Sequence, residues 1–218
     1  MPCAGEMNVD APAKKRRTRI QTEKRELILE AALEVFSTHG FRGSTIDQIA
    51  EAAGMSKPNL LYYFRRKEDI HEALIQRLLK TWLQPLRELD DVGDPVTELR
   101  GYIRRKLEMA RDYPRESRLF ANEILQGAPR IMPLLEGELK ELVDEKAAII
   151  TGWMRAGRIA ETDPRHLIFS IWATTQHYAD FDVQVRAVLG PNRGGEGRFD
   201  DAARFLEQLF VEGLKPKN

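Results

Sequence analysis

The hydrophobic positions of the chain recur with a helical period over most of its 218 residues. Beyond Thr22 they fall at the spacing of one buried helix face, at Ile28, Ala32, Val35 and Phe36. The short run 39–41, which contains Gly40, ends this segment. The sequence has no alternating strand pattern, internal repeat or low-complexity tract. The pattern therefore predicts an all-α fold.

The same period predicts the later helices. One begins at Lys67 and continues to about Leu89, and Pro85 is expected to bend it or end it early because proline removes a helix hydrogen bond. Further helices are expected over residues 96–112, 115–125, 132–156, 164–188 and 201–211. The segment 189–198, which is rich in glycine, is predicted to be the loop that separates the last two helices.

The stretch 45–64 has the signals of two short helices joined by a tight turn. Thr45 and Gln48 have the spacing of a capping box at the start of the first helix. Gly54 stands where a helix ends in a left-handed conformation, and Ser56 is a good cap for the second helix. Pro58 falls in the first turn, where a missing N–H is tolerated. The spacing predicts a helix-turn-helix unit.

The second of these helices has more polar and aromatic residues than its own packing needs. Leu60, Leu61 and Phe64 supply apolar anchors. The remaining polar and aromatic residues are Lys57, Asn59, Tyr62 and Tyr63. Their side chains need a partner outside the helix. This combination is typical of a helix that contacts DNA.

Three runs within residues 28–74 resemble the DNA-binding domain of the TetR family, namely FSTHGF, STIDQIAEAAGMS and LLYYFRRKEDI. The resemblance implies a three-helix DNA-binding domain, expected over 22–68, and the basic residues before it are expected to belong to a flexible arm over 1–21. The helix of this domain from Ser56 to Phe64 is expected to lie in the major groove. An all-helical ligand-binding and dimerisation domain is expected over 69–218.

Motif position assigns a role to each candidate DNA contact. Lys57 and Asn59 are expected to read base edges, because lysine favours guanine and asparagine favours adenine. Phosphate contacts are expected from Thr45, Tyr63 and Lys67, with packing on the first helix as an alternative for Tyr63. Tyr62 suits either role. The full candidate set is Thr45, Ser56, Lys57, Asn59, Tyr62, Tyr63 and Lys67.

The distribution of charge agrees with DNA binding at the amino-terminal end. The chain has no net charge, 42% hydrophobic and 31% charged residues, which is ordinary for a soluble protein. Residues 14–70 contain twelve Lys and Arg against eight Asp and Glu, whereas residues 71–218 contain 22 against 24. The basic cluster KKRRTR is either an arm that contacts phosphates or a minor groove, or a solubilising tail. The sole cysteine, Cys3, lies in a leader without an apolar core, so we predict a cytoplasmic protein.

The carboxy-terminal half suggests the effector. The runs LIFSIWATTQHYADFDVQV and KLEMARDYPRESRLFANEIL, with NLLYYF and WLQPL, resemble TetR-type regulators of pyrimidine utilisation. This resemblance implies uracil or thymine as the effector. Trp172 and Gln176 lie four residues apart on one helix face, so an indole and an amide point the same way and suit a planar amide ring. The alternative is that Trp172 belongs to the core and Gln176 satisfies a backbone group.

Other residues complete the predicted ligand site and the dimer interface. Trp82, Phe120 and Tyr178 are candidates for an apolar wall. Glu123 is either an acceptor for a ring N–H or a solvated or salt-bridged carboxylate. The dimer interface is predicted on an apolar stripe formed by Phe205, Leu206, Leu209 and Phe210. In an alternative interpretation, this stripe packs within one subunit.

Together these features predict a homodimeric repressor that binds a palindromic operator and is released by a small planar ligand. The alternatives are a TetR-type regulator of another metabolite or a lipophile, and a DNA-binding protein whose pocket is empty. An enzyme is not expected, because the G-x-S-x-G, H-E-x-x-H and Walker patterns are absent. His166, His177 and Asp180 are too few and too scattered to predict a metal site.

Overall fold

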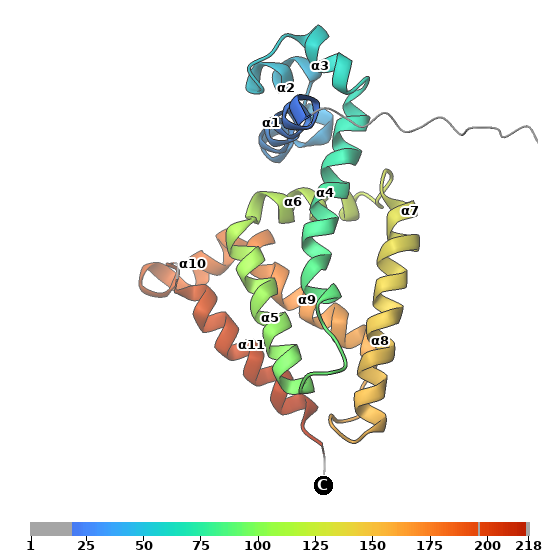
Figure 1. The fold of residues 1–218 in the computed structure, drawn as a ribbon. Helices are drawn as coiled ribbons and strands as arrows, with labels where there is room; N and C mark the ends of the chain where they lie inside the picture. Colours follow the sequence, from blue (N-terminus) through green and yellow to red (C-terminus); the bar gives the residue numbers. More distant parts are fainter. Residues whose placement is uncertain (1–18, 196, 217–218) are drawn as a thin grey trace, which may run out of the picture.

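The computed structural model describes residues 19–195 and 197–216 of the chain. These residues form helices and no strand, so the predicted all-α fold is confirmed. A small domain of three helices lies at one end of the molecule, and the remaining helices form a larger bundle (Figure 1). Residues 1–18, which include Cys3 and most of the predicted basic arm, lie outside the described residues.

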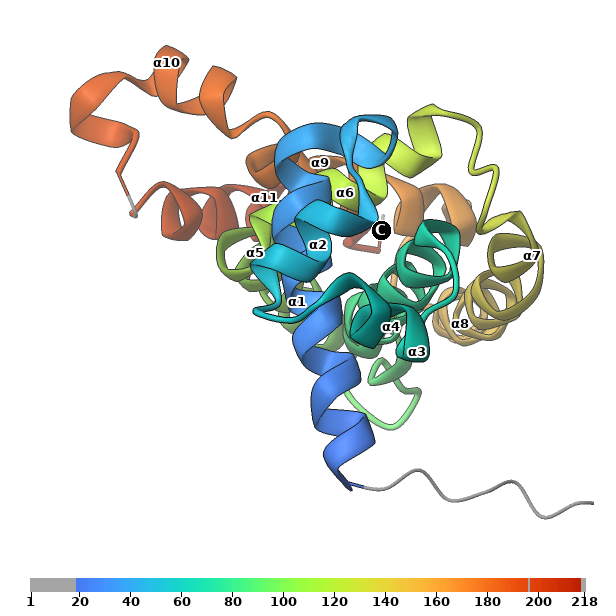
Figure 2. The same ribbon diagram turned by 90° about the horizontal axis from the view of Figure 1, so that it is seen from above.

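The small domain is built on helix α1 (Arg19–Gly43). Its buried residues, among them Ile28 and Phe36, pack against α2 (Ile46–Ala52), which lies over α1 when the molecule is viewed from above (Figure 2). α3 (Lys57–Tyr63) follows after a tight turn and anchors itself through the fully buried Leu60. These three helices form the predicted helix-turn-helix domain.

The turn has the local chemistry that the sequence indicates. The Thr45 hydroxyl accepts a hydrogen bond from the Gln48 backbone N–H at 3.2 Å, and the Gln48 side chain accepts one from the Thr45 N–H at 2.8 Å. The capping box is therefore confirmed. Gly54 has a φ of 64°, the left-handed conformation that ends a helix at little cost only for glycine. Ser56 is at the predicted cap position, but its side chain makes no cap hydrogen bond.

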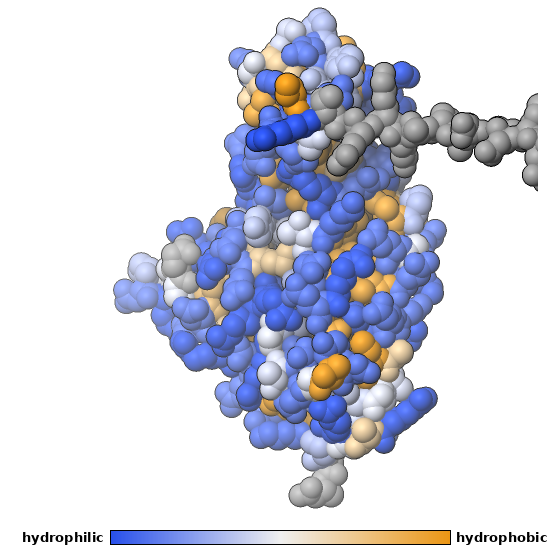
Figure 3. All heavy atoms as spheres, in the orientation of Figure 1, coloured by the Kyte–Doolittle hydropathy of each residue, from blue (hydrophilic) through white to orange (hydrophobic). Residues whose placement is uncertain are grey.

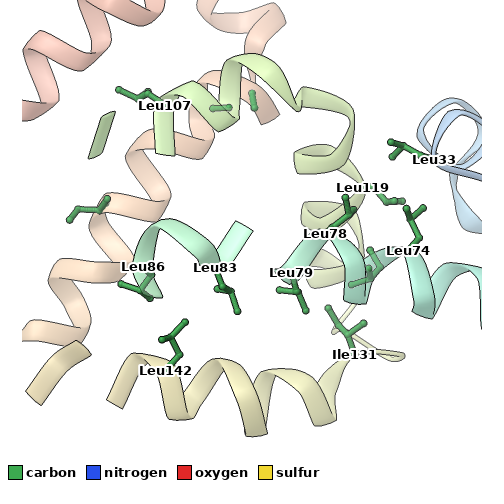
Figure 4. Close-up of a cluster of buried hydrophobic side chains, with 14 of the residues drawn as sticks. Leu33, Leu74, Leu78, Leu79, Leu83, Leu86, Leu107, Leu119, Ile131 and Leu142 are labelled. Atoms are coloured by element: carbon green, nitrogen blue, oxygen red, sulfur yellow. The ribbon is translucent and has the colours of Figure 1, made fainter. Parts of the chain in front are cut away.

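Helix α4 (Lys67–Arg87) joins the two parts of the molecule, because it begins in the small domain and continues into the bundle. Pro85 is accommodated in its last turn, and the helix ends at Arg87. Leucines along α4 meet side chains from several other helices in the bundle core, as with Leu83 and Leu142 (Figure 4). A single helix therefore packs against both parts of the molecule.

The bundle is completed by helices from the rest of the chain. α5 (Pro95–Asp112) lies against α4, α9 and α11, and α6 (Pro114–Leu125) lies against α1 and α9. The remaining elements are α7 (Met132–Leu134), the π-helical turn η1 (Leu135–Leu139), α8 (Lys140–Arg155), α9 (Pro164–Asp180), α10 (Asp182–Arg193) and α11 (Arg198–Leu214).

Two of the predicted helices differ from those observed. The single helix expected over 132–156 is divided by η1, whose i to i+5 hydrogen bonds add a residue to one turn that hydrophobic spacing does not reveal. The helix expected over 164–188 breaks at Phe181, where φ is −115° and ψ is 28°. The predicted loop 189–198 is also partly wrong, because α10 continues to Arg193 across a kink at Gly190, which has a φ of 72°.

None of the helices in the described residues is long and apolar enough to cross a membrane. The face of the molecule in Figure 3 is mostly hydrophilic, with hydrophobic residues in small separate patches. The hydrophobic residues are gathered inside, in one continuous core that includes residues from both the small domain and the bundle.

Candidate DNA-binding surface and effector cavity

Helix α3 presents its polar side chains to solvent. Lys57 and Asn59 are exposed, and the Tyr62 side chain is 71% exposed. Lys57 makes a surface ion pair with Asp47 of α2 at 2.9 Å, and an exposed pair of this kind is weak enough to exchange for a phosphate or a base. The helix therefore offers a lysine, an amide and a phenol on one accessible surface, which is the chemistry that base and phosphate contacts require.

Two of the expected phosphate contacts have structural partners within the domain. Tyr63 is half-buried with its ring edge on Tyr62, and its carbonyl accepts a hydrogen bond from Arg25 at 2.8 Å. The Lys67 ammonium donates to the carbonyls of Phe41 and Ser44 at 2.7 and 2.6 Å. Lys67 thus ties the start of α4 to the end of α1, and its geometry gives no support to the phosphate contact that we expected.

A small cavity lies in the bundle, where α4, α5, α6 and α9 meet. Its walls carry Trp82 from α4, Lys106 from α5, Phe120 from α6, and Trp172 and Gln176 from α9. Leucine side chains complete the lining, and the space has a volume of about 60 Å³. The structure therefore brings four of the six predicted ligand residues together around one cavity.

Lys106 is the polar centre of this cavity, and the sequence prediction missed it. Its side chain is 3% exposed, and its ammonium lies 5.5 Å from the centre of the Trp82 ring. Within the described residues it makes no hydrogen bond or ion pair. Burial lowers the pKa of Lys106 to about 7, an effect that the charge of Asp180 partly opposes. The signal in the sequence is a lysine within the apolar stripe of residues 99–110.

The two cavity residues of α9, Trp172 and Gln176, differ in whether the protein holds their side chains by a hydrogen bond. Trp172 is half-buried, and its indole N–H donates to the Tyr102 hydroxyl at 2.5 Å, which fixes the orientation of its ring. The Gln176 side chain makes no hydrogen bond to any described residue. Neither the Gln176 amide nor the Lys106 ammonium is therefore satisfied by the protein itself, and both border the cavity.

A wider cleft of about 410 Å³ lies beside the cavity, between α6 and α9. Phe120 and Gln176 line both spaces, so these two side chains separate them. Asp180 also lines the cleft and accepts a hydrogen bond from Ser117 at 2.6 Å. Burial raises the pKa of this carboxyl above its usual value.

Glu123 and Tyr178, the other two predicted ligand residues, do not line the cavity. The Glu123 carboxylate is 3% exposed and accepts a hydrogen bond from the Arg130 guanidinium at 2.8 Å, so it has the salt-bridged geometry of the alternative interpretation. Tyr178 packs toward Phe199 of α11, with ring centres 6.3 Å apart.

The predicted interface stripe on α11 is divided between two faces. Leu206 is buried within the subunit, and Phe210 is half-buried. Phe205 and Leu209 point outward and are 60% and 51% exposed. One face of the stripe therefore packs into the core, and the other face exposes two large apolar side chains to solvent.

A helix-turn-helix domain joined by one helix to a bundle with a polar cavity defines a ligand-responsive transcription regulator. Residues 28–74 match the profile described as bacterial regulatory proteins, tetR family, and residues 75–217 match that of the YcdC-like protein, C-terminal region. The chain belongs to the TetR family. Members of this family bind operator DNA and a small effector as dimers, and the chain is accordingly a regulator and not an enzyme.

Known relatives are regulators of the same kind. The chain is 48% identical over 202 residues to the HTH-type transcriptional regulator RutR of Escherichia coli strain K12, covering 93% of this chain and 95% of the relative. It is 34% identical over 80 residues to the HTH-type transcriptional repressor NicS of Pseudomonas putida, covering 36% and 38% of the two chains.

Solved structures share the fold at low sequence identity. AibR in complex with isovaleryl coenzyme A and operator DNA is 19% identical with a TM-score of 0.66, covering 85% of this chain and 97% of that one. The ketosteroid regulator KstR2 of Mycobacterium tuberculosis is also 19% identical with a TM-score of 0.66, covering 89% and 96%. These similarities support the fold alone.

Proposed function

We propose that the chain is a cytoplasmic repressor of pyrimidine metabolism that binds a palindromic operator as a homodimer and is released by uracil or thymine. The cavity between the two indoles, with its unsatisfied Lys106 and Gln176, is the observation that carries this proposal. The 48% identity to RutR, together with the resemblance of the sequence to regulators of pyrimidine utilisation, supports it.

A pyrimidine ring matches the cavity in its hydrogen-bonding groups. Uracil and thymine present two N–H donors and two carbonyl acceptors in one plane. The Gln176 amide is able to accept from a ring N–H and donate to the neighbouring carbonyl, while the Lys106 ammonium donates to a carbonyl. The rings of Trp82 and Trp172 supply the apolar faces against which a base packs.

The size and polarity of the cavity favour a small effector over a lipophile. A space of about 60 Å³ is well below the roughly 300 Å³ at which pockets for drug-sized ligands begin. A lipophilic ligand would also leave Lys106 and Gln176 buried without hydrogen bonds, which is costly. The cleft of about 410 Å³ beside Phe120 would favour a larger metabolite, which would need Phe120 to move.

Release of the operator follows if the effector prefers one arrangement of α4. This helix carries Trp82 in the cavity wall and begins beside the helix-turn-helix domain. A dimer presents two α3 helices to successive major grooves, about 34 to 36 Å apart, so a small rotation of α4 changes their spacing. An effector that binds the DNA-competent form less well shifts the dimer away from the operator by that difference in affinity.

Calorimetric titration of uracil and thymine into the purified protein, with a gel-shift assay on promoter DNA, tests the proposal. We expect saturable binding that releases the operator, and loss of both effects in Gln176→Ala and Lys106→Met. Gln184→Ala, an exposed glutamine of α10, is the matched control. Absence of pyrimidine binding by the unaltered protein would reject the effector, and binding that leaves the operator occupied would reject the mechanism.

A further inference from the structure

A cluster of charged and aromatic side chains, two of them buried and two half-buried, lies at the junction of the small domain and the bundle, outside the cavity. It consists of Phe41 from the end of α1, His71 from α4, Glu123 from α6 and Arg130 from the segment that follows α6. We call these four residues the junction cluster. Neither the cavity nor the exposed surface of α3 includes any of them.

The charged groups of the junction cluster, Glu123 and Arg130, form one ion pair. The Glu123 carboxylate accepts hydrogen bonds from the Arg130 backbone N–H at 3.0 Å and from its guanidinium at 2.8 Å. His71 Nε2 lies 3.9 Å from the same carboxylate, but burial lowers the pKa of His71 to about 4 and keeps the ring neutral at pH 7. Glu123 therefore depends on Arg130 as its charged partner.

Arg130 also contacts the DNA-binding domain. Its guanidinium lies 3.7 Å from the centre of the Phe41 ring, in cation–π geometry. The backbone carbonyl of Phe41 is held by Lys67, which holds the carbonyl of Ser44 as well. Ser44 directly precedes Thr45, the cap of α2. A displacement of Arg130 thus reaches the helix-turn-helix unit through Phe41.

The other end of the junction cluster is connected to the cavity through α6. Phe120 in the cavity wall and Glu123 are three residues apart, so they are neighbours on the surface of the same helix turn. An effector that pushes Phe120 therefore moves the carboxylate that holds Arg130.

We propose that Arg130 is a positioning residue that couples the effector cavity to the DNA-binding domain. The Glu123–Arg130 pair and the Arg130–Phe41 contact transmit the position of α6 to the end of α1. Arg130 contacts neither the effector nor the operator, so its removal leaves each separate affinity nearly intact and reduces the influence of one on the other. The inference rests on the proposed function for the identity of the effector only.

The test measures the dissociation constant of the operator with and without saturating uracil. The variant is Glu123→Gln with Arg130→Met, because Arg130→Met alone leaves a buried carboxylate unpaired and endangers folding. We expect uracil to weaken operator binding at least about tenfold in the unaltered protein and less than about twofold in the double variant, with uracil affinity for the free protein unchanged. Arg165→Ala with Asp144→Asn removes an arginine–carboxylate pair on the surface of the bundle, away from the junction cluster, and should retain the full effect.

An unchanged effect of uracil in the double variant, with its thermal unfolding still cooperative, overturns the proposal. A second comparison does not need the effector. Phe120→Ala should change operator affinity about threefold or more when Arg130 is present and leave it unchanged in the double variant. If uracil does not bind the unaltered protein, the proposed effector is wrong, and this comparison still decides the role of Arg130.

Discussion

Burial of Lys106 destabilises the folded protein at neutral pH. Its pKa is about 7 in the fold and near 10.5 in the unfolded chain, so the unfolded state binds more protons between these values. The destabilisation by Lys106 is therefore absent above pH 10.5 and grows as the pH falls toward 7. A buried lysine that destabilises the fold in this way is a strong candidate for function.

Replacement of Lys106 by methionine should consequently stabilise the protein. We expect the free energy of unfolding at pH 7 to rise by about 2 to 4 kcal/mol, because the side chain keeps its length and loses the charge. Urea unfolding at pH 7 and pH 9.5 provides the measurement, and the gain should shrink at the higher pH. A variant that is less stable than the unaltered protein at pH 7 would show that the ammonium has a partner of its own.

Replacement by alanine is expected to affect stability at Lys67 and DNA recognition at Asn59. Lys67→Ala removes the donor of two backbone carbonyls, so it should lower stability by about 1 to 3 kcal/mol. Asn59→Ala removes an exposed side chain, so it should leave stability unchanged and reduce discrimination at one base pair by about 1 to 3 kcal/mol.

Thermal unfolding and gel shifts on operators with single base changes separate these two effects. A Lys67→Ala protein with unchanged stability and uniformly weaker DNA binding would support the phosphate role that the sequence predicts. Loss of stability in Asn59→Ala would instead place that side chain inside the domain.

At the scale of helices, the sequence was informative wherever a helix buries a continuous stripe. α4 and α5 begin within a residue of their predicted starts, because many of their residues are buried and the apolar period is strong. α10 has no buried residue among those described, so the apolar period that predicted a helix as far as residue 188 did not separate it from α9, and glycines near its end resemble a loop. The division at η1 follows from a single added residue, which the spacing of apolar residues does not detect.

The candidate site was predictable to a similar degree. The i, i+4 spacing of Trp172 and Gln176 was enough to place both on one side of the cavity. Glu123 and Phe120 are near each other in sequence, yet one belongs to the junction cluster and the other to the cavity wall. Which of two adjacent helix faces meets a cavity depends on neighbouring helices, and sequence spacing alone does not specify those neighbours.

At the scale of the whole molecule, the outward face of α11 is our candidate for the two-fold interface. Phe205 and Leu209 expose large apolar area there, and a second copy would bury it. Leu209→Glu should convert the dimer to a monomer at micromolar concentration in sedimentation velocity, because an unpaired carboxylate would be buried at the contact.

Val92→Glu is the matched control for this change, since Val92 is an exposed apolar residue in the segment between α4 and α5. It should leave the dimer intact. Dimers that persist in Leu209→Glu would place the interface elsewhere, and the exposed valines of α10, Val183 and Val188, would be the next residues to change.

The tie between Lys67 and the end of α1 also has a consequence for engineering biosensors. A chimera that joins this bundle to the DNA-binding domain of another regulator needs a crossover point, and the short segment between α3 and α4 is the obvious place to cut. A cut there would separate Lys67 from Phe41 and Ser44, and it would pair Arg130 with an unrelated surface. A functional hybrid would therefore have to retain the end of α1 with the bundle, although the two are distant in sequence.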